Sequence, residues 1–185
     1  FMRNEVPGMG RDFCDMSGPY DREFGDYALV NAMLPRVYMP ELQGNVFERV
    51  SSGIAGQLIG DDNLLDYDQF LAKKPRRPGA QFAWHQDQGY WPAGIADTRT
   101  VTCSLAIDDS LKANGCLRCV SGSGVERVLR PHRSVTGSRE EGHTLEAEVT
   151  EEDSVEYLEV LRGGITLHDE WVVHGSACNP SDGWR

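Results

Sequence analysis

The segment Trp84-His85-Gln86-Asp87-Gln88 places an imidazole and a carboxylate two residues apart. In a β-strand, residues i and i+2 project from the same face, so His85 and Asp87 are predicted to point at one ion. A third ligand must then come from elsewhere in the chain. Two histidines and one carboxylate on one face of an octahedron leave three positions open, an arrangement that suits iron(II) and oxygen chemistry.

The third ligand is predicted near the end of the chain, at His174. This residue follows a pair of valines and precedes Gly175, which predicts a strand end that faces a cavity. Arg185 lies beyond a turn-rich segment, and a buried guanidinium can grip a carboxylate through two parallel hydrogen bonds. These later residues matter because a His-x-Asp pair alone also describes a partly buried histidine beside a surface aspartate.

The composition argues against several classes of protein. The 185 residues are enough for one domain with a hydrophobic core. The net charge of -11, from 29 acidic and 18 basic residues, argues against nucleic acid as a partner and, less strongly, against an anionic membrane surface. No apolar run is long enough to span a bilayer, and no export signal is visible. Five irregularly spaced cysteines favour reduced thiols and a cytoplasmic location.

Two helices are predicted in the N-terminal part of the chain, residues 1–60, which is therefore expected to be mostly helical. Within 23–34 the apolar residues have mixed helical spacing, and Pro35 ends the pattern. Within 40–59 they follow the i, i+4, i+8 spacing of a one-sided helix.

From residue 61 onward the pattern changes to short strands separated by glycine and proline turns. The predicted strands are 65–71, 82–85, 98–107, 116–120, 144–149, 155–161, 164–168 and 172–175. Many short strands predict a sandwich or barrel, and a jelly roll closes its sheets around a central site. We therefore predict a single domain over 1–185, mainly β with N-terminal helices and a double-stranded β-helix (jelly-roll, cupin-like) core over 61–185.

The stretch from about Leu64 to Arg185 resembles the phytanoyl-CoA dioxygenase family of iron(II)/2-oxoglutarate oxygenases. The resemblance covers roughly two thirds of the chain, with its elements in the family's order. The matching residues are His85-Gln86-Asp87 with Tyr90, Trp91 and Pro92, then Asn114-Gly115-Cys116-Leu117 leading to Ser121-Gly122-Ser123, and finally His174-Gly175-Ser176 with Asn179 and Arg185.

The resemblance implies a role for each matching residue. His85, Asp87 and His174 match the iron ligands. Arg185 stands where an arginine binds the 5-carboxylate of 2-oxoglutarate, and Ser176 matches a hydroxyl that supports that carboxylate.

Three further site residues are expected. Gln69 is a candidate for contact with the co-substrate, on a strand face predicted to point inward. Tyr90 and Trp91 would line the substrate side. Small residues at Cys103 and Ser104, where some members carry a tryptophan, depart from the family's pattern. The final strand expected after Arg185 is absent, so we expect the chain to be truncated there.

The implied activity is hydroxylation of an unactivated C–H bond of a small molecule, with iron(II), 2-oxoglutarate and dioxygen as cofactor and co-substrates and with release of succinate and carbon dioxide. Related halogenases lack the carboxylate ligand, so Asp87 favours hydroxylation. The substrate, the oligomeric state and a desaturating outcome stay open. The alternative is a non-catalytic cupin-like protein that binds a metal or a small ligand.

Other residues that could carry chemistry are predicted to be structural. Cys116 and Cys119 have the spacing of a redox or zinc pair, but positions three apart face opposite sides of a strand. His168 is expected to be a hydrogen-bonded structural histidine, with a spare metal ligand as the alternative. The basic residues of 73–77 are interpreted as a solvated turn, with contact to an anionic group of the substrate as the alternative. The acidic segment 134–159 is interpreted as a solvated insert or edge hairpin, with a lid over the site as the alternative.

Overall fold

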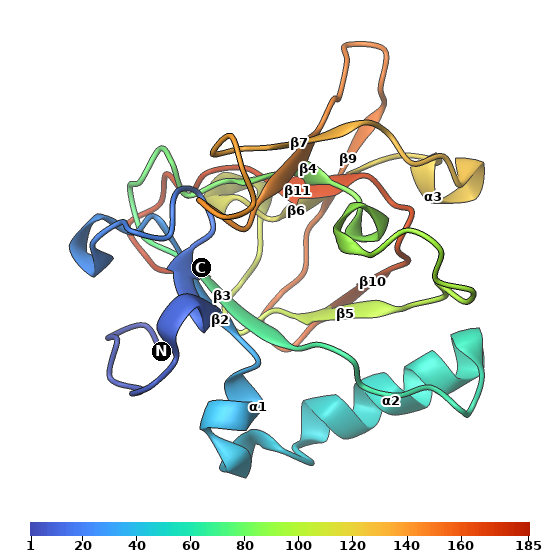
Figure 1. The fold of residues 1–185 in the computed structure, drawn as a ribbon, viewed down its shortest axis with the longest axis horizontal. Coiled ribbons are helices and arrows are strands. Elements are labelled where there is room, and N and C mark those ends of the chain that lie inside the picture. Colours follow the sequence, from blue (N-terminus) through green and yellow to red (C-terminus); the bar gives the residue numbers. More distant parts are fainter.

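A computed structural model describes residues 1–185, whose strands form four antiparallel sheets (Figure 1). The strands are β1 (Phe13–Asp15), β2 (Leu29–Met33), β3 (Gln69–Lys73), β4 (Phe82–His85), β5 (Thr102–Leu105), β6 (Leu117–Val120), β7 (His132–Ser134), β8 (Leu145–Ala147), β9 (Val155–Leu158), β10 (Ile165–His168) and β11 (His174–Ser176). The helices are α1 (Pro35–Tyr38), α2 (Val46–Ile59) and α3 (Ser123–Glu126), with 3-10 helices η1 (Gly10–Asp12), η2 (Phe24–Asp26), η3 (Pro40–Leu42), η4 (Asp87–Tyr90) and η5 (Lys112–Asn114).

The sheets have the strand orders β4-β11-β6-β9, β10-β5, β1-β2-β3 and β7-β8. In Figure 1 the four-stranded sheet lies above the β5–β10 pair, and β2 and β3 lie beside the space between them. The chain is mainly β with antiparallel pairing throughout, as the predicted jelly roll requires.

The helix predicted over 23–34 is wrong. The segment forms η2 and then β2, the central strand between β1 and β3. All five β2 residues are buried, because clusters around Leu29 and around Val30 pack on its two faces. A strand buried on both faces reads as a continuous apolar run, which periodicity cannot distinguish from a helix. The N-terminal part therefore contributes strands as well as helices.

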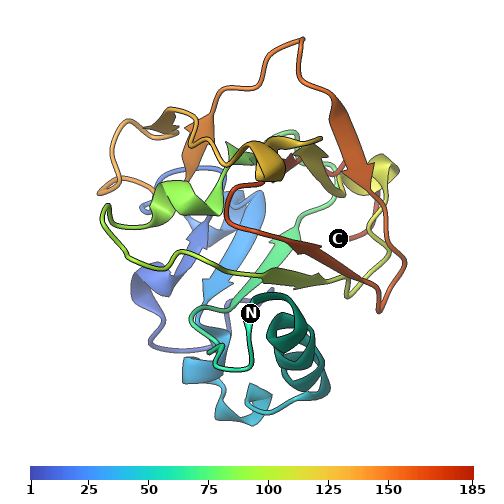
Figure 2. The same ribbon diagram turned by 90° about the vertical axis from the view of Figure 1, so that its right-hand side faces the viewer.

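The helix predicted over 40–59 is present from Val46 to Ile59 as α2, and the start of the range forms the 3-10 helix η3. The start of α2 is fixed by Asn45, whose side chain accepts from the Glu48 backbone N–H at 3.0 Å, while the Glu48 carboxylate accepts from the Gly44 N–H at 2.8 Å. Figures 1 and 2 show α2 on one side of the strands. No helix in the structure combines the length and the apolar character needed to cross a membrane.

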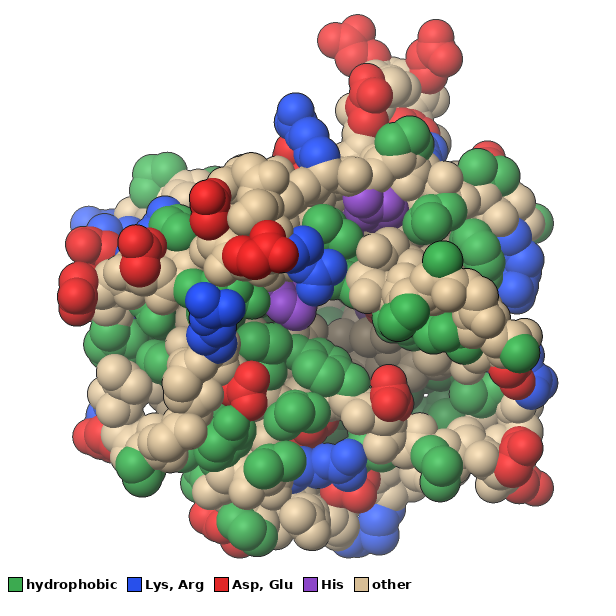
Figure 3. Space-filling view, viewed as in Figure 1, with side chains coloured by type: hydrophobic (Ala, Val, Ile, Leu, Met, Phe, Trp, Pro, Cys, Tyr) green, Lys and Arg blue, Asp and Glu red, His purple; other side chains and the backbone are tan.

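The acidic segment divides into a buried part and an exposed part. Strands β7 and β8 pair, and Leu145 and Ala147 are buried, so this region is more than a solvated insert. The loop 148–154 between β8 and β9 projects at the end of the molecule opposite α2 (Figure 2). Between these ends, a hollow opens in the face drawn in Figure 3, with a histidine side chain at its edge.

Candidate metal and co-substrate site

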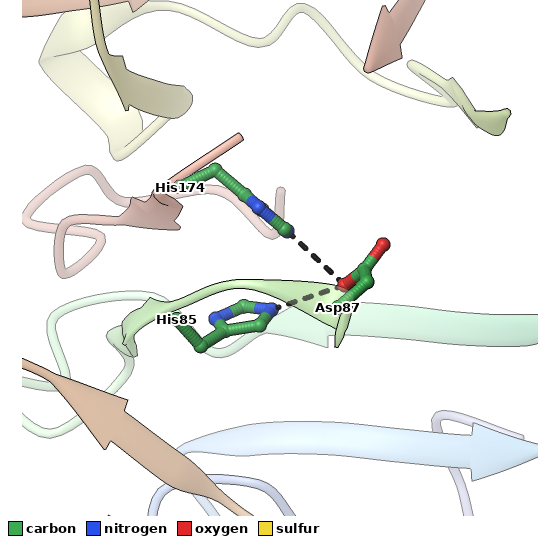
Figure 4. Close-up of side chains that lie close together, drawn as sticks. All are labelled: His85, Asp87 and His174. Atoms are coloured by element: carbon green, nitrogen blue, oxygen red, sulfur yellow. Dashed lines mark ion pairs between the residues drawn. The ribbon is translucent and has the colours of Figure 1, made fainter. Parts of the chain in front are cut away.

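Three side chains, two from the adjacent strands β4 and β11 and one from η4, converge beside the β5–β10 pair. His85 ends β4, His174 begins β11, and these two residues are direct partners in the antiparallel ladder. Asp87 is the first residue of η4 rather than part of the strand, yet its carboxylate still reaches both rings. The Nε2 atoms of both histidines lie 3.6 Å from the same oxygen, Oδ1 of Asp87 (Figure 4).

The two imidazoles are oriented by their other ring nitrogens. Nδ1 of His85 lies 2.8 Å from the Ala83 carbonyl, and Nδ1 of His174 lies 2.9 Å from the Val172 carbonyl. Because a carbonyl only accepts, each Nδ1 must carry the proton, and each Nε2 has its lone pair free. Burial, together with the neighbouring histidines His168 and His85, holds the pKa of His174 well below its usual value, so the ring is neutral at pH 7.

Asp87 supplies the negative charge of the cluster. Burial alone would raise the pKa of its carboxyl, but contacts with His168 and His85 and the nearby His174 hold that pKa well below its usual value. Two imidazoles and one carboxylate thus offer ligand atoms within 4.8 Å of one another, at separations too long for hydrogen bonds between them. This donor set fits a divalent cation such as iron(II).

Gln86, between the two ligands, anchors the end of β4. Its carboxamide donates to the carbonyls of Val128 and Trp171, both at 2.8 Å, and accepts from the Arg130 N–H at 2.8 Å. Its backbone N–H donates to Nε2 of His132 at 3.0 Å. Sequence analysis gave Gln86 no role, and its fully buried, fully bonded side chain explains the polar residue between His85 and Asp87.

Gly175 allows β11 to lie close against β4. A Cβ at this position would lie 2.9 Å from the Phe82 carbonyl and 3.1 Å from the Ala83 carbonyl, both of them backbone atoms. The position therefore needs glycine so that His174 can approach His85. The glycine of the His174-Gly175-Ser176 motif thus has a packing reason next to the cluster.

Two basic residues, Lys73 at the end of β3 and Arg185 at the end of the chain, lie next to each other. Arg185 pairs with β3 through its backbone, since Lys73 N–H donates to the Arg185 carbonyl at 2.6 Å and Arg185 N–H donates to the Lys73 carbonyl at 3.3 Å. Its guanidinium donates to Oγ of Ser110 at 2.7 and 3.2 Å. Arg185 is thus held in place by β3 and Ser110, and neither Lys73 nor Arg185 has an acidic partner within ion-pair distance.

Lys73 corrects the interpretation of 73–77 as a solvated turn. Its side chain is only 2% exposed and donates to the Ala177 carbonyl. Burial, and then the positive charge of Arg185, lowers the pKa of Lys73 to about 6. Arg76, in contrast, is exposed and pairs with Asp182, as a solvated turn predicts. Sequence spacing gave no sign that this lysine lies beside Arg185.

The other two co-substrate candidates have different surroundings. Ser176 is buried and lies two residues after His174 on β11, so it shares the face of that histidine. Gln69 is exposed, and its side chain accepts from the Tyr67 hydroxyl at 3.5 Å. No hydrogen bond joins Gln69 to Arg185 or to the His-Asp-His cluster, and its role stays a prediction.

The structure brings Tyr90 to the cluster by an aromatic contact. The rings of Tyr90 and His85 meet edge to face with centroids 5.6 Å apart, and the Tyr90 hydroxyl accepts from the Leu145 N–H at 2.9 Å. His143 stacks on Tyr90 at 5.3 Å, and the Arg139 guanidinium lies 5.1 Å from the same ring. These last two residues belong to the acidic segment and were not predicted to line the site.

Trp91 is only indirectly linked to this group. Its backbone N–H donates to the Gln88 carbonyl at 3.4 Å, and no hydrogen bond or ring contact joins it to the His-Asp-His cluster. Its substrate role stays a prediction.

His168 is not the hydrogen-bonded structural histidine that we expected. It is buried, and neither of its ring nitrogens has a hydrogen-bond partner. Its Nε2 lies 3.5 Å from Oδ2 of Asp87, the oxygen that does not face the other two histidines. The Thr102 hydroxyl donates to the same Oδ2 at 2.8 Å. Both residues were missed as parts of the site.

Comparison with solved structures supports the fold. EvdO2 from Micromonospora carbonacea var. aurantiaca matches with a TM-score of 0.75 at 24% identity, over 98% of this chain and 72% of that chain. A non-heme alpha-ketoglutarate-dependent carbocyclase from nogalamycin biosynthesis, SnoK, matches with a TM-score of 0.67 at 21% identity, over 98% of this chain and 64% of that chain. At these identities the likeness establishes the jelly-roll fold.

Comparison with curated proteins and family models establishes the family. The ectoine dioxygenase of Nocardia farcinica (strain IFM 10152) is 32% identical over 69% of this chain and 46% of its own length. A probable alpha-ketoglutarate-dependent hypophosphite dioxygenase of Stutzerimonas stutzeri is 28% identical over 80% of this chain and 51% of its own. The chain thus spans about half the length of these relatives. The phytanoyl-CoA dioxygenase (PhyH) model matches residues 23–185, so the chain belongs to the phytanoyl-CoA dioxygenase family.

Proposed function

We propose that the chain carries the active site of an iron(II)/2-oxoglutarate-dependent dioxygenase that hydroxylates a small molecule. The observation that carries the proposal is the convergence of His85, Asp87 and His174, whose possible ligand atoms lie within 4.8 Å of one another, with each Nε2 3.6 Å from Oδ1 of Asp87. Iron(II) bound there, with 2-oxoglutarate and dioxygen, supplies the oxidation, which yields succinate, carbon dioxide and the hydroxylated product.

The buried cations are proposed to bind the 5-carboxylate of 2-oxoglutarate. Arg185 offers a guanidinium already oriented by Ser110, and Lys73 brings a second cation beside it. An arriving carboxylate would pair with the Arg185 guanidinium, which has no acidic partner in the protein, and would favour protonation of the Lys73 amine, whose pKa is about 6 in the free protein. Ser176 is proposed to add a hydroxyl to the same carboxylate, because it lies on the inner face of β11.

Substrate is proposed to enter on the side of Tyr90 and Trp91. Tyr90 connects the edge of His85 to His143 and Arg139 in the acidic segment, so groups outside the metal cluster face the same space. The curated relatives are named for ectoine and hypophosphite, both small molecules, which supports a small-molecule substrate here. A cytoplasmic location is proposed from the five free thiols.

The test measures turnover of 2-oxoglutarate by the purified protein supplied with iron(II) and ascorbate in air. Succinate should accumulate with the wild type, also at the slow rate expected without substrate, and His174→Ala and Asp87→Ala should abolish it. Under anaerobic conditions, addition of iron(II) and then 2-oxoglutarate should produce a visible absorption band in the wild type alone. Full turnover by either variant would contradict the ligand assignment, and absence of the band in the wild type would favour a non-catalytic binding protein.

A further inference from the structure

The two oxygens of the Asp87 carboxylate have different surroundings. Oδ1 faces the Nε2 atoms of His85 and His174, and Oδ2 points away from both rings (Figure 4). Oδ2 instead lies 2.8 Å from the Thr102 hydroxyl and 3.5 Å from Nε2 of His168. One carboxylate thus divides its oxygens between the proposed ligands and a second pair of side chains.

That second pair comes from the β5–β10 pair of strands, which hydrogen-bonds separately from the sheet of the ligands. Thr102 and His168 are direct cross-strand partners in the antiparallel pairing of β5 with β10. Partners of this kind project from the same face with their Cβ atoms close together, so both side chains reach one acceptor. The β5–β10 ladder therefore positions two donors at one oxygen.

His168 has no other acceptor to serve. The side chain is buried and neither ring nitrogen is hydrogen-bonded, and an unpaired buried N–H is unfavourable. The ring lies against His174, with centroids 4.0 Å apart, so it is confined beside the cluster. Its Nε2 lies 3.5 Å from Oδ2 of Asp87, and a shift of about half an ångström would bring the two atoms to hydrogen-bond distance.

The geometry also argues against His168 as a fourth ligand. The ligand atoms that lie within 4.8 Å of one another belong to His85, Asp87 and His174, and His168 is outside this group. Its Nε2 approaches the oxygen that the other two imidazoles do not face. A ring in this place can hold the carboxylate but cannot share the centre of the group.

We propose that His168 is a positioning residue that, together with Thr102, holds Oδ2 of Asp87 and leaves Oδ1 as the single oxygen for the metal. This inference rests on the proposed function. A carboxylate that binds through one oxygen occupies one coordination position, and a carboxylate that turns to bind through both occupies two. The two donors therefore keep a position free for the co-substrates, and they orient the carboxylate before the metal arrives.

The test measures cobalt(II) binding to the purified apoprotein, in which cobalt(II) reports affinity by calorimetry and coordination by its visible absorption bands. His168→Leu and Thr102→Val should each weaken binding about tenfold, as loss of a partner that orients a metal ligand does, and each should change the visible bands. His168→Gln keeps a donor, and Thr102→Ser keeps the hydroxyl, so both should stay within about threefold of the wild type with its spectrum.

The possible results distinguish failure of the positioning role of His168 from failure of the proposed dioxygenase function. Wild-type affinity and spectrum in His168→Leu and Thr102→Val, with binding lost in Asp87→Ala, would overturn the inference and leave the proposed function standing. Equal loss in His168→Gln and His168→Leu would make His168 a ligand and would also overturn it. No cobalt(II) binding by the wild type would overturn both. Circular dichroism detects a folding defect in either variant. Because Thr102 and His168 lie on different strands, the variant that folds normally still tests the inference.

Discussion

The proposed metal end and the proposed carboxylate end of the site differ in their electrostatics. At the proposed metal end, two imidazoles lie beside one carboxylate, and backbone carbonyls hold their second nitrogens. At the carboxylate end, Lys73 and Arg185 lie buried side by side without an acidic partner. The first group is arranged before its ion arrives, whereas the second stays electrostatically unfavourable until an anion binds.

Substitutions at the two ends should therefore have different effects on ligand binding. Loss of a metal ligand removes a donor from an ordered group, so it should affect metal affinity directly. Loss of Lys73 or Arg185 removes an attraction for the anion and also removes a repulsion between the two residues in the free protein. The two effects on anion affinity partly cancel for Lys73. They cancel less for Arg185, because Ser110 also orients its guanidinium toward a ligand.

The largest effect is expected from Arg185→Leu. Truncating one partner of a buried charge pair costs about 2–5 kcal/mol, so 2-oxoglutarate should bind at least about 30-fold more weakly. Cobalt(II) affinity should stay at the wild-type value, because no metal ligand is touched. Calorimetric titrations with each ligand measure both. Arg162→Leu, at an exposed arginine, is the matched control and should change neither affinity. A parallel loss of cobalt(II) binding in Arg185→Leu would contradict the separation of the two ends.

A smaller effect is expected from pH through Lys73. Its pKa of about 6 leaves the amine mostly neutral at pH 7 to 8, whereas a bound carboxylate favours the protonated form. Binding of 2-oxoglutarate should therefore take up a proton above pH 6, and the affinity should fall up to about tenfold per pH unit as the pH rises.

Calorimetry in buffers of different ionisation enthalpy measures this proton uptake. Lys73→Met should abolish it, whereas Lys112→Met, at an exposed lysine, should keep it. An affinity that is constant from pH 6 to 8 in the wild type would show that Lys73 does not take part in binding the anion.

The smallest effect is expected from Gly175→Ala, which tests the contact between the two strands of the metal end. The added Cβ would meet two backbone carbonyls of β4 at 2.9 and 3.1 Å. Relief of that overlap should cost about 1–3 kcal/mol of unfolding free energy and weaken cobalt(II) binding about fivefold. Urea denaturation and metal titration measure these changes. Gly183→Ala, where a Cβ meets nothing within 4 Å, should change neither value.

The two ends also differ in what the sequence reveals. His85 and Asp87 could be predicted as a pair because they are two residues apart in the sequence. Their side chains do lie close together, although Asp87 follows the end of the strand. His174 and Arg185 were predicted from their sequence surroundings, and their roles came from resemblance to a family. Lys73, in contrast, is buried only because the backbone at the end of the chain pairs with β3, and no local pattern encodes a contact of that sequence separation.

The incorrect predictions arose because contacts between distant parts of the chain determined the structure there. The segment 29–33 was predicted as helix because burial on both faces removed the alternation that marks a strand. The pairing of Thr102 with His168 depends on the register of β5 with β10, which single-sequence patterns do not give. Local spacing thus predicted the metal ligands that are adjacent in the chain, and tertiary pairing determined the residues around them.

The bonds of Gln86 have a consequence for the order in which the molecule folds. Its carboxamide joins the end of β4 to Val128, Arg130 and Trp171, all far along the chain. Closing such loops costs chain entropy that is recovered only when the distant segments arrive. The ligand geometry should therefore appear late on the folding pathway. A metal ion would bind the finished molecule in preference to its intermediates, and metal capture during refolding would report completed folding.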